Sequence, residues 1–129
     1  MSDLINLQQP GISLVLGGQR SGKSVFAEII VENIGGGFYV ATSETLDDEM
    51  AARISVHQDR RGEQWETLEE PILLADALLS LKGHGKPALV DCLTLWLSNI
   101  MALDKNIDAE IDSLCTLTES LDFPVVFVS

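Results

Sequence analysis

The chain has 129 residues, 46% of them hydrophobic, which favours a single domain built around one core. A formal net charge of −12, from 20 acidic and 8 basic residues, would repel a polyanion such as DNA, so nucleic acid is not expected as a partner. The two cysteines are isolated, and the N-terminus lacks a basic segment ahead of its apolar residues. No apolar run approaches the roughly 20 residues of a membrane helix. We therefore expect a cytoplasmic protein without a membrane span.

A glycine-rich loop is predicted between the first strand and the first helix. The apolar run 12–16 predicts the strand, and residues 25–32 have the spacing of a helix. Between them, Gly17-Gly18-Gln19-Arg20-Ser21-Gly22-Lys23-Ser24 matches the phosphate-binding pattern G-x-x-x-x-G-K-[ST]. Its glycines would let main-chain N–H groups approach an anion, Lys23 would reach the β- and γ-phosphates, and the Ser24 hydroxyl would bind Mg²⁺. This context favours a nucleoside triphosphate site over an ordinary glycine turn before a helix.

The rest of the chain alternates short apolar runs with amphipathic segments. Further strands are predicted at 38–41, 64–68, 88–91 and 124–129, and further helices at about 46–60, 72–81, 93–102 and 108–121. The last run is continuously apolar and rich in β-branched residues, as expected of a central parallel strand. The alternation predicts an α/β fold of the P-loop class, with a mainly parallel sheet and helices on both faces, in one domain spanning 1–129. Because ligand-binding loops follow the carboxyl ends of such strands and the chain ends at one, we expect either a fragment or an incomplete active site.

Two polar residues outside the loop are candidates for chemistry. Asp91 ends an apolar strand, where it could hold the same Mg²⁺ as Ser24 or merely cap the next helix. His57 lies on the predicted helix 46–60, near arginines that could neutralise a small anionic ligand. A neutral imidazole there could attack phosphorus, although a lone histidine on a helix is more often structural or solvated.

Four other residues, two tryptophans and two glutamates, keep two interpretations open. Trp65 and Trp96 could stack on a ligand, with a place in the core as the default. Glu69 and Glu70 could contact a ribose or a base, or could be solvated acids at a helix start. His84 lies between two glycines in a predicted turn and is expected to be exposed.

Several segments, in their order and spacing, resemble one family over nearly the whole chain from about Ile12 onward. The segments are the loop 17–24, then Tyr39-Val40-Ala41-Thr42-Ser43, then Leu46-Asp47-Asp48-Glu49-Met50-Ala51-Ala52-Arg53-Ile54 with His57 and Arg60, then Trp65-Glu66-Thr67-Leu68-Glu69-Glu70-Pro71. The family is the bifunctional adenosylcobinamide kinase/adenosylcobinamide-phosphate guanylyltransferase of cobalamin biosynthesis. The resemblance implies a P-loop fold, and it implies that a C-terminal segment with an Asn-Glu-Val-Gly-type loop is missing.

The resemblance also implies a function. Such a protein phosphorylates adenosylcobinamide with GTP or ATP, then transfers GMP from GTP to adenosylcobinamide phosphate through a guanylylated histidine, giving adenosyl-GDP-cobinamide. His57 matches that histidine, although some relatives carry two adjacent histidines where this chain has Val56 and His57. The implied partners are the corrinoid substrates, the nucleotide with Mg²⁺ and further copies of the chain in a homo-oligomer. The alternatives are another P-loop small-molecule kinase and a nucleotide-binding fragment without turnover.

The implied site residues match this sequence position by position. His57 and Lys23 would be catalytic, and Ser24 and Asp91 would bind the metal. The nucleotide would be bound by Gly17, Gly18, Gln19, Arg20, Ser21, Gly22, Lys23, Ser24, Ala41, Thr42, Ser43, Gln58, Asp59, Arg60, Arg61, Glu69 and Asp91.

Overall fold

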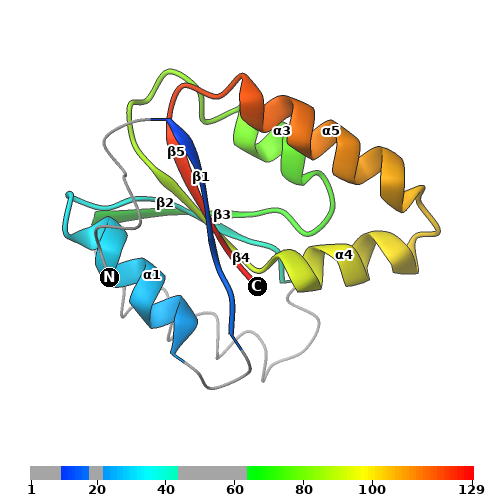
Figure 1. The fold of residues 1–129 in the computed structure, drawn as a ribbon, viewed down its shortest axis with the longest axis horizontal. Helices are drawn as coiled ribbons and strands as arrows, with labels where there is room; N and C mark the ends of the chain where they lie inside the picture. The colour runs from blue at the N-terminus through cyan, green and yellow to red at the C-terminus, as the bar shows by residue number, and fades with distance from the viewer. Residues whose placement is uncertain (1–9, 18–21, 44–63) are drawn as a thin grey trace.

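A parallel sheet forms the centre of the protein (Figure 1). The computed structural model describes residues 10–17, 22–43 and 64–129, so the predicted helix 46–60 lies outside the described residues. The described strands pair in the order β1-β5-β4-β2-β3, and every pair is parallel. The strands are β1 (Gly11–Val15), β2 (Gly37–Ala41), β3 (Trp65–Glu69), β4 (Ala88–Asp91) and β5 (Pro124–Val128). The predicted α/β fold is confirmed.

Helices cover both faces of the sheet, as predicted (Figure 1). One face packs on α1 (Lys23–Glu32), and the other packs on α3 (Leu74–Leu79), α4 (Leu93–Ala102) and α5 (Ile107–Glu119). Alternate residues of one strand enter the two cores: Tyr39 contributes to the α1 side, and Phe38 and Val40 contribute to the other side. The strand β5 is buried at every position and lies between β1 and β4, which confirms the predicted central strand.

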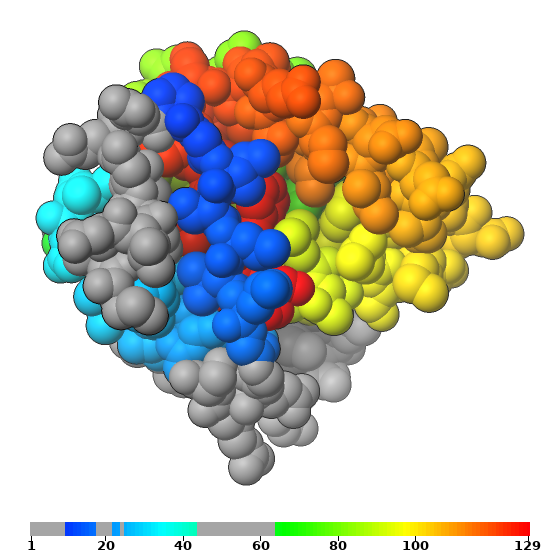
Figure 2. Space-filling model, viewed as in Figure 1, coloured from blue at the N-terminus to red at the C-terminus, as the bar shows by residue number. Residues whose placement is uncertain are grey.

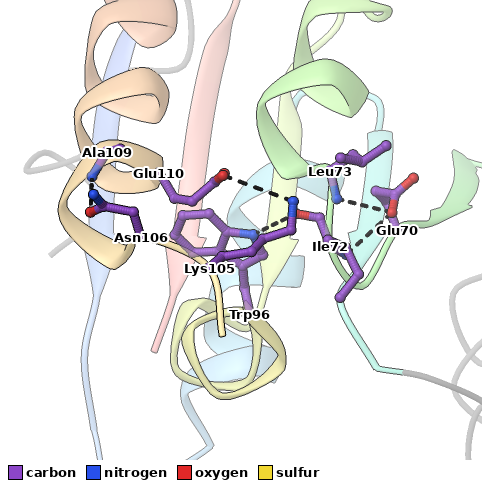
Figure 3. Close-up of polar contacts among 8 residues, drawn as sticks. All are labelled: Glu70, Ile72, Leu73, Trp96, Lys105, Asn106, Ala109 and Glu110. Carbon is purple, nitrogen blue, oxygen red and sulfur yellow. Dashed lines mark hydrogen bonds and ion pairs between the residues drawn. The ribbon is translucent and has the colours of Figure 1, made fainter. Parts of the chain in front are cut away.

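The helix α3 is shorter than predicted. The sequence predicts a helix over 72–81, but α3 runs only from Leu74 to Leu79. The carboxylate of Glu70 accepts hydrogen bonds from the N–H groups of Ile72 (3.2 Å) and Leu73 (3.1 Å), as Figure 3 shows. These bonds hold residues 70–73 in a turn, so the helix begins two residues later than its apolar spacing indicates.

The helix α5 begins at a side-chain cap, which Figure 3 also shows. The Asn106 side chain accepts a hydrogen bond from the N–H of Ala109 at 3.1 Å. Beside it, Lys105 and Glu110 form an ion pair at 3.9 Å. The cap satisfies one of the N–H groups that a helix start leaves without an intrahelical partner, and it fixes α5 beside the end of α4.

The strand β1 lies on the surface of the protein (Figure 2). It pairs with β5 on one side, and among the described residues no strand pairs with its other side. Ile12 and Leu14 are 55% and 54% exposed, and they line an apolar groove of about 300 Å³ with Leu97 of α4 and Leu114 of α5. No helix formed by the described residues is long and apolar enough to cross a membrane.

Candidate nucleotide-binding site

The glycine-rich loop connects β1 to α1. Gly22 is the N-cap of α1 and has a left-handed backbone (φ 81°, ψ 13°), which strains any residue with a side chain. Lys23 is the first residue of the helix, and its ammonium group donates a hydrogen bond to the carbonyl oxygen of Gly17 at 2.6 Å. The lysine charge therefore lies at the start of the loop, beside a helix N-terminus whose dipole favours an anion. Gly18, Gln19, Arg20 and Ser21 lie outside the described residues.

The carboxyl ends of the strands bring predicted site residues to one edge of the sheet. Val15 pairs with Val128, Val128 with Asp91, Asp91 with Ala41, and Ala41 with Glu69. At about 4.8 Å per strand, Asp91 lies roughly 10 Å from the end of β1, whereas Glu69 lies roughly 19 Å away. A ligand whose phosphates contact the loop could therefore place a phosphate near Asp91, and Glu69 could meet only a distant part of that ligand.

Asp91 does not cap the following helix. The N-cap of α4 is Cys92, with no side-chain capping bond, and the Asp91 carboxylate instead accepts a hydrogen bond from the Tyr39 hydroxyl at 2.5 Å. Leu89 packs on the α1 side of the sheet, so strand alternation directs Asp91 to that same side, where the glycine-rich loop lies. The capping interpretation of Asp91 is therefore wrong, and its carboxylate lies on the α1 side of the sheet.

The donor set at this edge fits Mg²⁺ bound together with a nucleotide. Mg²⁺ prefers oxygen ligands and is commonly held by one or two carboxylates plus substrate phosphates. Asp91 supplies such a carboxylate, and Ser24, the second residue of α1, is a hydroxyl-bearing residue at the loop. No cluster of three or more His, Cys, Asp or Glu side chains that could hold a metal occurs in residues 10–17, 22–43 and 64–129.

Thr42 connects the ends of β2 and β4. Its hydroxyl donates to the carbonyl oxygen of Cys92 and accepts from the Cys92 N–H, both at 2.8 Å, and its own N–H donates to the carbonyl of Asp91 at 3.1 Å. Thr42 is fully buried, and its carbonyl accepts a bond from the Asn99 side chain at 2.8 Å. In the described structure Thr42 therefore supports this edge, between buried Ala41 and half-buried Ser43.

Two of these supporting residues, Tyr39 and Asn99, were not singled out as site residues from the sequence. Asn99 also donates to the carbonyl of Pro71 at 3.0 Å, so one amide bridges the chain after β2 and the chain after β3. Tyr39 lies on the same side of β2 as Ala41, the register partner of Asp91, and two residues before it. Only the strand register could have indicated Tyr39 from the sequence. Asn99 resembles any polar residue of an amphipathic helix.

The loop start is also fixed by the end of β5. The N–H of Ser129 donates to the carbonyl of Val15 at 3.0 Å, and the N–H of Gly17 donates to the carbonyl of Ser129 at 3.3 Å. The hydroxyl groups of Thr94 and Ser129 are 2.6 Å apart, which ties the first turn of α4 to the same point. Ser129 therefore links the start of the loop at Gly17 to the first turn of α4.

His57, Gln58, Asp59, Arg60 and Arg61 lie outside the described residues. The described ends of their segment are Ser43 and Gln64. Because β2 and β3 are parallel neighbours, Ser43 lies at the carboxyl edge of the sheet and Gln64 lies at the amino edge.

The remaining candidates have structural roles in the described residues. The indole N–H groups of Trp65 and Trp96 donate to Glu32 and to the carbonyl of Ile72, and both rings are buried, so the core interpretation is confirmed. Glu70 caps the turn before α3. His84 is exposed as predicted, and it precedes β4, at the amino edge of the sheet. It lies at the opposite edge from the glycine-rich loop.

This fold and this loop define a P-loop nucleotide-binding protein of the α/β class. The family model described as cobinamide kinase / cobinamide phosphate guanyltransferase matches residues 13–129. The chain belongs to this family, and the resemblance noted in the sequence is confirmed.

Curated relatives carry names of the same kind. The chain is 43% identical over 119 residues to the bifunctional adenosylcobalamin biosynthesis protein CobP of Pseudomonas aeruginosa, a match that covers 90% of this chain and 69% of that protein. It is 34% identical over 131 residues to the bifunctional adenosylcobalamin biosynthesis protein CobU of Escherichia coli and to the protein of that name from Salmonella typhimurium. Each of these two matches covers 90% of this chain and 72% of the relative.

Proposed function

We propose that this protein is a bifunctional enzyme that phosphorylates adenosylcobinamide and then transfers GMP to the product. The observation that carries the proposal is the family match across residues 13–129, which includes the loop start, Asp91 and His57. The names of the relatives describe bifunctional proteins of adenosylcobalamin biosynthesis. The two cysteines are free thiols, which fits a reducing cytoplasm, and we propose a single domain that functions in a homo-oligomer.

The kinase step needs positioning and charge stabilisation more than covalent chemistry. A hydroxyl oxygen of adenosylcobinamide would attack the γ-phosphorus of GTP or ATP, and the bond between that phosphorus and its bridging oxygen would break. Lys23 and the N–H groups at the start of α1 would stabilise the negative charge on the transferring group. Mg²⁺, held through Asp91 and Ser24 beside the phosphates, would neutralise part of the remaining charge.

The transferase step would use His57 as a nucleophile. A neutral imidazole nitrogen would attack the α-phosphorus of GTP, forming a P–N bond while the bond to the bridging oxygen breaks and pyrophosphate leaves. A phosphate oxygen of adenosylcobinamide phosphate would then attack the same phosphorus, breaking the P–N bond and giving adenosyl-GDP-cobinamide. Gln58, Asp59, Arg60 and Arg61 would contact the nucleotide beside His57. Glu69 would contact a part of the nucleotide remote from the phosphates.

Labelling the protein tests this proposal. After incubation with GTP labelled in its α-phosphate, the denatured chain should retain label that is stable to base and lost in acid, as a phosphoramidate is. The variant His57→Ala should retain none. The matched control is His84→Ala, which removes the other imidazole of the chain at the opposite edge of the sheet and should retain full label. Label that persists in His57→Ala, or GTP that binds to the unaltered chain without labelling it, would contradict the transferase proposal.

A further inference from the structure

We propose that Tyr39 is a positioning residue for Asp91: its hydroxyl fixes the carboxylate in the orientation in which Asp91 meets the nucleotide-bound metal. The inference rests on the proposed function, in which Asp91 is a metal ligand. Tyr39 is not expected to touch the nucleotide or the metal.

The geometry between the two residues carries the inference. Asp91 pairs in register with Ala41, and Tyr39 precedes Ala41 by two positions on the same side of β2. The phenol therefore extends along the sheet toward the carboxyl edge, and its hydroxyl donates to Asp91 Oδ2 at 2.5 Å. A hydrogen bond to one carboxylate oxygen fixes the rotation of the group about its Cβ–Cγ bond. That rotation decides which oxygen faces the glycine-rich loop.

The phenol itself is held on its other side. Tyr39 is 5% exposed, and its ring packs edge-on against Trp65, with centroids 5.8 Å apart and planes at 83°. The Trp65 indole N–H donates to Glu32 Oε1 at 3.0 Å, and Glu32 is the last residue of α1. Lys23 begins the same helix. A chain of contacts through α1, β3 and β2 thus links the helix that begins at Lys23 to the Asp91 carboxylate.

Residues that hydrogen-bond a metal ligand generally matter almost as much as the ligand. Their substitution typically costs about 10–100-fold in metal affinity or activity. Tyr39→Phe keeps the ring and its packing and removes one oxygen atom, so the fold and the metal-independent contacts with the nucleotide should remain.

The test compares GTP binding in two buffers. A fluorescent GTP analogue is titrated into the full chain in EDTA and again in Mg²⁺. The dissociation constant in EDTA divided by the dissociation constant in Mg²⁺ measures how much the metal adds to binding. In Tyr39→Phe this ratio should fall by about 10-fold or more, while the constant in EDTA changes by less than about 2-fold. A ratio equal to that of the unaltered chain would overturn the inference.

A double-mutant cycle separates positioning from a general loss of structure. If Tyr39 acts through Asp91, the double variant should have the ratio of Asp91→Asn alone, because the two changes are not independent. A ratio lower by the product of the two single effects would overturn the inference. Trp65→Phe keeps the Tyr39 hydroxyl while removing the indole, so it should lower the ratio less than Tyr39→Phe does, and an equal or larger loss would count against the hydroxyl.

Failure of the proposed function gives a different result. A chain that binds the GTP analogue in neither buffer contradicts the nucleotide site and the inference with it. If the unaltered chain binds the GTP analogue and Asp91→Asn leaves the ratio unchanged, Asp91 is not a metal ligand and the role of Tyr39 is overturned. The proposal that the glycine-rich loop binds the nucleotide would still stand.

Discussion

Replacing Thr42 by valine should destabilise the protein, although the two side chains have nearly the same shape. The Thr42 hydroxyl both donates to and accepts from the backbone of Cys92, and Thr42 is fully buried. Valine removes both bonds and leaves the Cys92 N–H without this partner, whereas the Cys92 carbonyl still accepts a bond from the Trp96 N–H at 3.2 Å. An unpaired buried N–H costs about 1–3 kcal/mol and the lost bond to the carbonyl about 0.5–1.5 kcal/mol, while burying a methyl group in place of the hydroxyl offsets about 1 kcal/mol. The expected loss is therefore about 0.5–3.5 kcal/mol.

Urea unfolding followed by tryptophan fluorescence measures this loss. With an m-value of about 2 kcal/mol per molar, a loss of about 2 kcal/mol lowers the midpoint by about 1 M. The matched control is Thr118→Val on α5, where the hydroxyl bonds to the carbonyl of Cys115 within its own helix at 2.8 Å. Water can replace that bond at the surface, so the control should stay within about 0.5 kcal/mol of the unaltered chain. If both valine variants unfold at the same urea concentration, the reasoning about the junction of β2 and β4 is refuted.

Two further predictions concern the loop and the core. Lys23→Ala removes the ammonium group at the loop start and should weaken binding of a fluorescent GTP analogue by about 10–100-fold. The urea midpoint should change little. Undiminished affinity for the analogue would exclude Lys23 from the phosphate site. Leu89→Ala empties a fully buried position in β4 and should lower the free energy of unfolding by about 2–5 kcal/mol. Leu14→Ala, at a position 54% exposed, should lower it by less than about 1 kcal/mol. Equal losses would contradict the burial of β4 and the exposure of β1.

The features that the sequence predicted well are encoded locally. Strands of a parallel sheet are buried on both faces, so they form the continuous apolar runs seen at 88–90 and 124–128. The glycine-rich loop requires a residue without a side chain at Gly22, and its pattern is contained in eight consecutive residues. The local signals therefore sufficed to predict the fold class and the position of the loop.

The contacts that shape the site could not be predicted in the same way. The hydrogen bond between Tyr39 and Asp91 joins residues 52 positions apart, and the bond from Thr42 to Cys92 spans 50 positions. Such pairs become visible only when the strand order and register are known, and many registers are compatible with the same apolar runs. The predicted start of α3 was wrong for a related reason. The Glu70 side chain accepts hydrogen bonds from the N–H groups of Ile72 and Leu73, which would otherwise belong to the first turn of the helix.

The uncharged rim formed by β1 has a consequence for handling the protein in solution. The strand consists of Gly11, Ile12, Ser13, Leu14 and Val15. It therefore carries no charged side chain that would oppose the pairing of a second molecule with its edge. Repulsion between molecules that each carry a net charge of −12 opposes such an approach, but it reaches only about 8 Å at physiological ionic strength and about 30 Å at 0.01 M. Buffers of low ionic strength should therefore keep concentrated solutions of the protein monodisperse, and added salt should promote aggregation.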